Sequence, residues 1–211
     1  MWTEEARISY LIFDNVKVEM VRLQIYQAFF HIETFKRFIP DLHEAVRTLA
    51  FHNFARSQTC HMTDGIFGEG IHSAKMESAK VKVLGLLGIV IPAGHRFLRS
   101  LKQARKIDRQ NDWSKVRGKL IDLEDLYRRA RNACEHLDQR IYRGEYSELH
   151  HFSFSIHYKL RFLDDKGELL LDFSEGALNE LVQMGEDVMA MVESIAKSKG
   201  NNLPEDDELN Q

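Results

Sequence analysis

The chain has 211 residues, of which 44% are hydrophobic and 29% charged, and its formal net charge is −3. These values predict one globular domain with a buried core and exclude a uniformly basic nucleic-acid-binding protein. The longest apolar run, 83–93, is far shorter than the roughly 20 residues of a membrane-spanning helix, so we expect no membrane partner. Two distant cysteines and an N-terminus unlike a signal peptide predict reduced thiols and a cytoplasmic protein.

Charge is distributed unevenly along the chain. Residues 93–143 contain 14 Lys and Arg against 7 Asp and Glu, whereas residues 164–211 contain 3 against 13. This asymmetry either creates a basic face for an anionic partner or lets the two parts of the chain attract each other. The sequence favours neither interpretation over the other.

The first third of the chain predicts helices. Residues 16–38 are dense in large apolar side chains and indicate a central helix, which Pro40 is expected to end. Asp41, with Glu44 three residues later, resembles a capping box and predicts the start of a second helix. Three glycines within 64–70 then predict a loop.

The middle of the chain contains the clearest helical periodicity. Residues 72–91 are compatible with a helix or a buried strand, with helix favoured, and 94–107 predict an amphipathic helix. After a polar connection at 108–112, a long helix is expected over about 113–142. Its apolar residues recur at alternating spacings of four and three, which indicates one continuous seam facing the core. The seam consists of Val116, Leu120, Leu123, Tyr127, Ala130, Cys134, Leu137 and Ile141.

The last third of the chain begins with a change of period from helical to alternating. Apolar and polar residues alternate over 152–162, which predicts a half-buried strand, and 169–173 predict its return strand. Ser174 is expected to cap a final helix. The fold class is therefore mainly α: a helical bundle in one domain, 1–199, with an antiparallel β-hairpin at about 150–173 inserted before the C-terminal helix. Residues 200–211 are expected to form an acidic, disordered tail.

The long helix has a polar row opposite its apolar seam. The residues of this outer row lie four apart, so they share one surface of the helix. The outer row consists of Arg128, Asn132, His136 and Arg140. Arg131 lies between the outer row and the seam, one turn before Glu135.

These residue types fit the cleavage of RNA without a metal. A histidine with a pKa near 6.5 exchanges protons at neutral pH, and arginines bind phosphate and stabilise charge that develops on it. RNA supplies its own nucleophile, the 2′-hydroxyl. A solvent-exposed histidine beside arginines is more commonly only solvated, and Arg131 and Glu135 fit an ordinary surface ion pair.

The segment Arg131-Asn-Ala-Cys-Glu-His136 resembles the Arg, four residues, His motif of the HEPN superfamily. The resemblance implies a compact helical domain that pairs as a homodimer and a composite active site at the subunit interface. It implies a metal-independent endoribonuclease of a toxin–antitoxin or phage-defence system, with RNA as substrate and an antitoxin as a further partner. Arg131 would bind phosphate, His136 would act as general acid or base and Asn132 would orient them, with Arg128 and Arg140 as further phosphate contacts.

The chain departs from the toxin pattern at one position. Toxin members often have a tyrosine two residues after the histidine, where this chain has Asp138, so neutralisation by modification of that tyrosine is in doubt. Inactive relatives with the same fold imply an alternative, a helical module that binds RNA or protein without catalysis. No metal or other cofactor is expected, because the chain lacks both an HExxH pattern and paired CxxC motifs.

Overall fold

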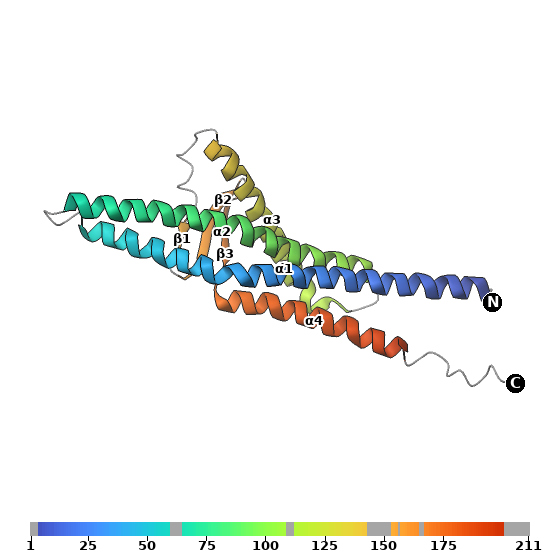
Figure 1. Cartoon of the computed structure of the whole chain (residues 1–211). Helices are drawn as coiled ribbons and strands as arrows, with labels where there is room; N and C mark the ends of the chain where they lie inside the picture. The colour runs from blue at the N-terminus through green and yellow to red at the C-terminus, as the bar shows by residue number, and fades with distance from the viewer. Residues whose placement is uncertain are drawn as a thin grey trace.

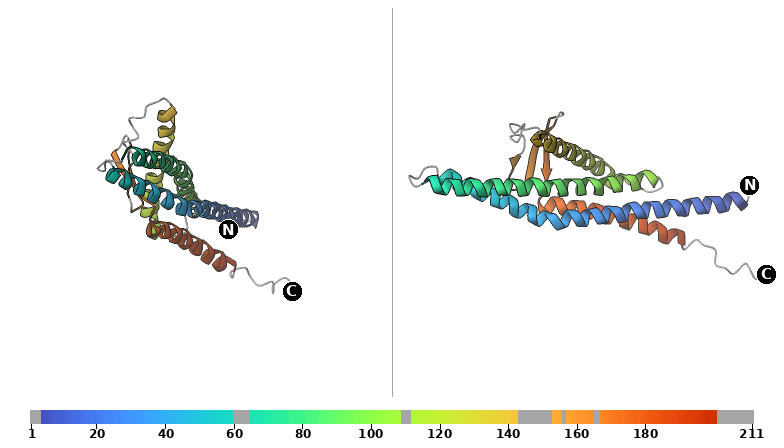
Figure 2. Two further views of the ribbon diagram at one scale, coloured as in Figure 1. Left: turned by 60° about the vertical axis from the view of Figure 1, so that its left-hand side comes forward. Right: turned by 45° about the horizontal axis from the view of Figure 1, so that its top comes forward.

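The computed structural model describes residues 4–59, 65–108, 112–142, 153–155, 157–164 and 167–200. Four helices dominate it, and an antiparallel hairpin precedes the last of them, which confirms the predicted fold class. The helices are α1 (Glu4–Thr59), α2 (Gly65–Ile107), α3 (Ser114–Tyr142) and α4 (Glu175–Gly200). α1 and α2 form a long antiparallel pair, α4 lies along the N-terminal half of α1, and α3 crosses α2 at an angle (Figure 1). Two further views show the C-terminal end of α3 pointing away from the α1–α2 pair (Figure 2).

α1 is one helix of 56 residues, so the expectation that Pro40 ends a helix and that Asp41 starts another is wrong. The proline removes one backbone hydrogen bond and costs about 3 kcal/mol in a helix interior. Buried side chains recur at spacings of four and three along α1 and pass straight through this point, so their packing offsets the cost. They are Val21, Ile25, Ala28, Ile32, Phe35, Ile39, Leu42 and Val46.

α2 is also continuous, over 43 residues. It starts at Gly65, so the predicted loop over 64–70 is wrong, and 83–91 is helix rather than strand. The glycines within 64–70 are tolerated because the rest of α2 packs on α1 and α3, and tertiary burial outweighs weak intrinsic propensity. Pro92 lies inside the helix between the buried residues Ile91 and Ala93.

One section of α2 would be long and apolar enough to cross a membrane by length and composition alone. It falls within 70–107, has a mean hydropathy of 1.5 and is 56% buried inside the protein. A core helix of a soluble protein meets the same criterion, and the burial here is against α1 and α3.

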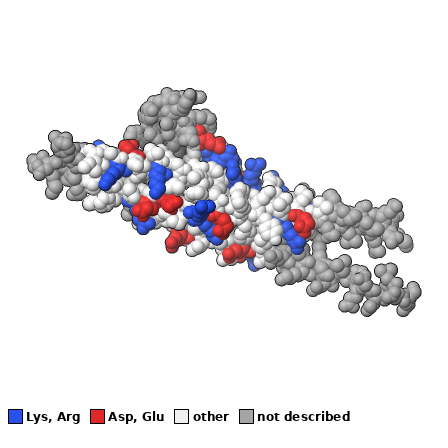
Figure 3. Space-filling view, viewed as in Figure 1, with Lys and Arg blue, Asp and Glu red and all other residues white. Residues whose placement is uncertain are grey.

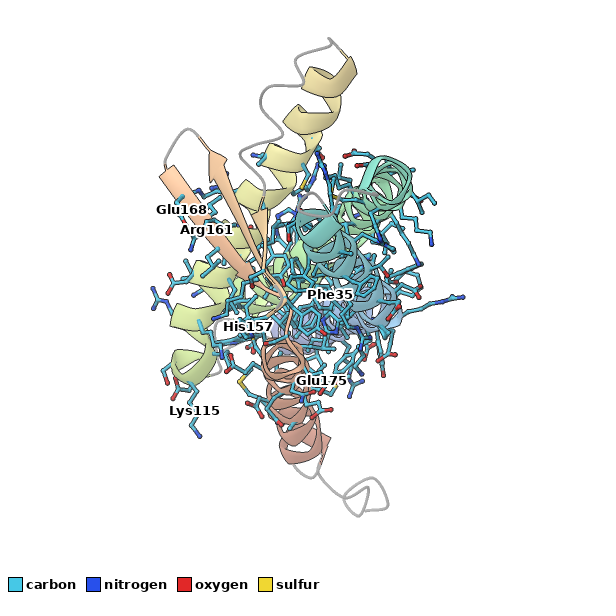
Figure 4. All side chains as sticks on the ribbon, turned by 90° about the vertical axis from the view of Figure 1, so that its left-hand side faces the viewer. Phe35, Lys115, His157, Arg161, Glu168 and Glu175 are labelled. Atoms are coloured by element: carbon cyan, nitrogen blue, oxygen red, sulfur yellow. The ribbon has the colours of Figure 1, made fainter. Side chains whose placement is uncertain are left out.

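Phe35 lies at the junction of three elements. Its ring centroid is 6.3 Å from that of Tyr127 on α3 and 6.2 Å from that of Phe173, which follows the sheet. Figure 4 shows Phe35 among the helices beneath the hairpin. The Tyr127 ring packs so closely on α2 that a Cβ added at Gly94 would lie 2.4 Å from it. The absence of a side chain at Gly94 therefore sets the distance between α2 and α3.

The sheet contains three antiparallel strands in the order β1-β2-β3. β1 (Ser153–Phe154) is short, and β2 (Lys159–Asp164) pairs with β3 (Gly167–Asp172) in the predicted hairpin, with Asp164 opposite Gly167. Arg161 and Glu168 lie on the hairpin, with Arg161 Nε 2.7 Å from Glu168 Oε1 (Figure 4).

The predicted single strand over 152–162 is wrong, because the chain turns between β1 and β2. The Ser155 N–H donates to the Lys159 carbonyl at 2.9 Å, and the Tyr158 N–H donates to the Ser155 carbonyl at 3.0 Å. Tyr158 has a φ of 59°, a left-handed conformation that is unusual for a residue with a side chain. Its ring stacks on that of His43 at 3.7 Å between centroids, which ties this turn to α1.

The end of the sheet leads directly into α4. The predicted cap is confirmed, because Ser174 Oγ accepts a hydrogen bond from the Ala177 N–H at 3.4 Å. α4 ends at Gly200, and residues 201–211 of the expected tail lie outside the described residues. The extent of the domain, 1–199, stays a prediction.

Candidate functional site

α3 presents two different faces along its length. Six seam residues, from Val116 to Cys134, are buried or packed against the core, which confirms the seam over that part. Asn132 is exposed on the opposite side, as expected for the outer row. The α3 backbone continues as helix through Tyr142, but the side chains of His136 and Arg140 lie outside the described residues.

The two arginines of the candidate site that are described both bond to acids on their own helix. Arg131 Nε donates to Glu135 Oε1 at 2.7 Å, as the spacing predicts, and Arg128 forms an ion pair with Asp125. All four side chains are at least one-third exposed, so these ion pairs are weak and readily exchange for an external anion.

A buried acid lies next to these arginines, between α2 and α3. Glu124 is 7% exposed, and its Oε2 accepts a hydrogen bond from Lys102 Nζ of α2 at 2.5 Å. Its other oxygen, Oε1, lies 3.8 Å from Nε2 of His95. Glu124 therefore links two basic side chains of α2 to α3.

His95 is almost completely enclosed, at 4% exposed. Burial lowers its pKa, the charges of Arg131, Arg99 and Arg128 lower it further, and Glu124 opposes them. The imidazole is therefore neutral at pH 7, and its buried Nδ1 has no hydrogen-bond partner within the described part of the chain.

These residues define a polar layer between α2 and α3, in which only Arg131 and Arg128 were sequence-predicted site residues. The layer consists of His95, Arg99, Lys102, Glu124, Arg128 and Arg131. The first three recur on α2 at spacings of four and three, and the last three do so on α3. That matched spacing is the signal that could have found the layer, although the sequence does not show which turns of the two helices meet. On the face in Figure 3, Lys and Arg side chains gather where α3 crosses α2.

The described residues contain no group of three His, Cys, Asp or Glu that could hold a metal ion. Near the N-terminal end of α2, His72 meets His52 of α1: the two Nδ1 atoms lie 3.0 Å apart. One ring therefore donates a hydrogen bond and the other accepts it. Cys60 and His61 are adjacent in the sequence, as are His150 and His151, and all four lie outside the described residues.

The polar layer can bind an anion but lacks a described proton-transfer group that is open to solvent. The described outer surface of α3 supplies Asn132, and one turn further the helix backbone places position 136 on the same side. Compared with known protein families, curated proteins and solved structures, the chain has no match. Any assignment of function therefore rests on the residues of this chain.

Proposed function

We propose that the protein is a metal-independent endoribonuclease of HEPN type that acts as a homodimer, as a toxin or a phage-defence effector. Arg131 binds the scissile phosphate and stabilises its developing charge, His136 transfers protons, and Asn132 orients them. Arg128 and Arg140 provide further phosphate contacts. The observation that supports this most is the position of Arg131, which lies at the edge of a cation-rich polar layer while the next residue, Asn132, is exposed.

The polar layer gives Arg131 an electrostatic setting suited to phosphate. Three arginines lie near His95, and Lys102 bonds to the buried carboxylate of Glu124. With Asp125 and Glu135 also counted, four cations face three carboxylates, so the region has one excess positive charge. An anion that displaces Glu135 from Arg131 would gain a bidentate contact and relieve part of this repulsion.

The reaction requires no external cofactor. The 2′-hydroxyl loses its proton to a base, its oxygen bonds to phosphorus, and the bond from phosphorus to the 5′-oxygen breaks as that oxygen takes up a proton. His136 performs one of these proton transfers and its counterpart in the second subunit performs the other. The products carry a 2′,3′-cyclic phosphate and a 5′-hydroxyl.

Pairing of two chains explains why the site faces away from the core of its own subunit. A two-fold axis beside α3 would bring the outer rows of both subunits together and exclude water from the phosphate between them. The prediction is a native mass of twice 24.6 kDa, measured by light scattering after gel filtration.

The test of catalysis compares site variants with matched controls on RNA in the presence of EDTA. Arg131→Ala and His136→Ala are expected to lower the cleavage rate at least about 100-fold. Arg22→Ala is the control for the arginine, because Arg22 forms a similar ion pair with Glu19 at 2.7 Å on α1. His157→Ala, in the exposed turn between β1 and β2, is the control for the histidine. Cleavage that survives both site substitutions contradicts the assignment.

A second candidate function is a module that binds RNA or a protein without cleaving it. The observation that favours it is that the polar layer has cations to hold a phosphate, whereas the histidine described within it, His95, is buried. Such a module would bind RNA through the same residues, and its Arg131→Ala variant would lose affinity with no cleavage in any variant.

A further inference from the structure

A groove lies between α1 and α2 near the end of their antiparallel pair, far along α2 from the polar layer. Its volume is about 640 Å³, which is within the range of small-molecule sites. The apolar side chains Val46, Leu49 and Met76 line it, together with the polar side chains Asn53 and Ser57. We call this depression the tip groove.

The tip groove has an exposed aromatic wall. Phe54 lines it and is 64% exposed, and Phe51, one turn earlier on α1, is 62% exposed. Phe51 is not itself among the lining residues, but it extends the exposed apolar surface beside Phe54. Flat, exposed rings of this kind bind nucleic-acid bases by stacking.

Cations also line the tip groove. Arg56 and Lys80 are among its lining residues, and its described lining contains no Asp or Glu. Lys80 Nζ bonds to Glu77 at 2.7 Å, but this ion pair is exposed, so a phosphate can replace the carboxylate at little cost. Residues 44–57 and 70–83 together contain five Lys and Arg against two Glu.

We propose that the tip groove binds a segment of single-stranded RNA, with a base stacked on Phe54 and a phosphate held between Arg56 and Lys80. Asn53 and Ser57 supply hydrogen bonds to the edge of the base. This proposal rests on the proposed function, since it names a second contact for the same substrate. Lys80 precedes His95 by 15 residues of continuous helix, so the tip groove lies about 22 Å along α2 from the polar layer. A few nucleotides of extended strand span that distance.

Single-stranded RNA fits this groove better than an anionic membrane does. The groove combines a flat aromatic surface, amide and hydroxyl groups and two cations within one depression. A nucleotide presents the matching groups: a π-face, hydrogen-bonding edges and a phosphate. A membrane surface would instead favour a continuous apolar face with cations at its margins.

The experiment measures fluorescence anisotropy of a labelled RNA oligonucleotide with 2′-O-methyl groups, which blocks cleavage. Phe54→Ala is expected to weaken binding about tenfold. Lys80→Ala is expected to weaken it a few-fold and to reduce the slope of log Kd against log salt concentration by about one. Melting temperatures of all variants show that the fold is retained.

Two control variants match these changes in chemistry and exposure. Phe30→Ala removes an aromatic ring that is 70% exposed elsewhere on α1. Lys36→Ala removes a lysine that bonds to Glu33 at 2.7 Å, the same spacing and distance as Lys80 and Glu77. Both are expected to change the affinity less than about twofold.

The outcomes separate this proposal from the proposed function. Loss of affinity in Phe54→Ala and Lys80→Ala, but not in the controls, supports the tip groove even if the wild-type protein cleaves no RNA. Equal affinity of Phe54→Ala and wild type overturns it, even where Arg131→Ala abolishes cleavage. The proposal is also overturned if the wild-type protein does not bind the oligonucleotide at low salt. It is likewise overturned if Phe54→Ala loses binding to anionic vesicles but retains binding to RNA.

Discussion

His95 Nε2 lies 3.8 Å from Glu124 Oε1 across the interface between α2 and α3, and both side chains are almost completely buried. The imidazole is neutral at pH 7 because burial and the surrounding arginines lower its pKa. The charge of Glu124 is therefore balanced mainly by Lys102, whose Nζ lies 2.5 Å from its other oxygen. At this interface a buried carboxylate therefore pairs with a partly buried ammonium group beside a neutral imidazole ring.

Glu124→Gln is expected to lower the free energy of unfolding by about 1–3 kcal/mol, because it leaves a partly buried ammonium group without its counter-charge. The control is Glu180→Gln, because Glu180 lies 2.5 Å from Lys119 between α4 and α3 but both side chains are exposed. We expect that change to cost at most about 1 kcal/mol. Urea unfolding at pH 7 measures both values, and equal costs would show that the burial of Glu124 is unimportant.

The stability of the protein is expected to fall as the pH drops below about 6.5. Burial, with a cationic neighbour, lowers the pKa of His95 and of His31 below that of the unfolded chain. The unfolded state therefore binds more protons in this range, so the contribution of these histidines to stability is present above pH 6.5 and is lost as the pH falls. His95→Gln should make the free energy of unfolding less dependent on pH.

Ser100→Ala provides the control for the pH experiment, since it alters a buried polar residue of α2 without removing a titratable group. Its free energy of unfolding should differ from that of the parent by the same amount at every pH. If His95→Gln also shifts the curve without changing its slope, His95 is not the titrating group.

The parts of the fold that were predictable are those in which a local sequence pattern is enough to determine the secondary structure. The seam from Val116 onward and the turn before Gly167 required no knowledge of the rest of the chain. Pro40 led to a wrong helix boundary because the free-energy cost of a proline inside a helix can be read from the sequence. The packing of Ile39 and Leu42 on other elements, which offsets that cost, is visible only in the folded structure.

Gly94→Ala is expected to lower the free energy of unfolding by about 1–3 kcal/mol. The added Cβ would lie 2.4 Å and 2.8 Å from two ring carbons of Tyr127, and this buried ring has little room to move. Gly88→Ala on the same helix is the matched control, because its Cβ would meet nothing within 4 Å. That change should stabilise the helix by about 0.5–1 kcal/mol. In thermal unfolding, we expect Gly94→Ala to lower the melting temperature and Gly88→Ala to raise it.

Only those residues of the candidate site that lie on α3 could be predicted from the sequence. Arg131 and Asn132 follow from a short motif within α3, and the 2.7 Å contact of Arg131 with Glu135 follows from their spacing. His95 and Lys102 lie some 20 to 40 residues earlier on another helix, and their approach to Glu124 depends on how α2 and α3 cross. The close approach of Tyr127 to Gly94 is part of that crossing, and the periodicity of either helix alone does not show which turns meet.

The left-handed conformation of Tyr158 predicts an unusual order of stability between two variants. Both Tyr158→Ala and Tyr158→Gly lose the ring that stacks on His43 at 3.7 Å. Alanine retains a cost of about 1–2 kcal/mol for the φ of 59°, which glycine avoids. Glycine loses more entropy on folding, by about 0.4–1 kcal/mol, so it should still be the more stable variant by about 0.5–1 kcal/mol.

The neighbouring residue provides the control for this comparison. Lys159 begins β2 with a side chain in solvent and a backbone outside the left-handed region, so Lys159→Ala should be more stable than Lys159→Gly. Urea unfolding of the four variants measures both orders. If alanine is the more stable residue at both positions, the turn between β1 and β2 relaxes when the Tyr158 ring is removed. The contact with His43, rather than the hydrogen bonds around Ser155, would then impose the left-handed backbone at Tyr158.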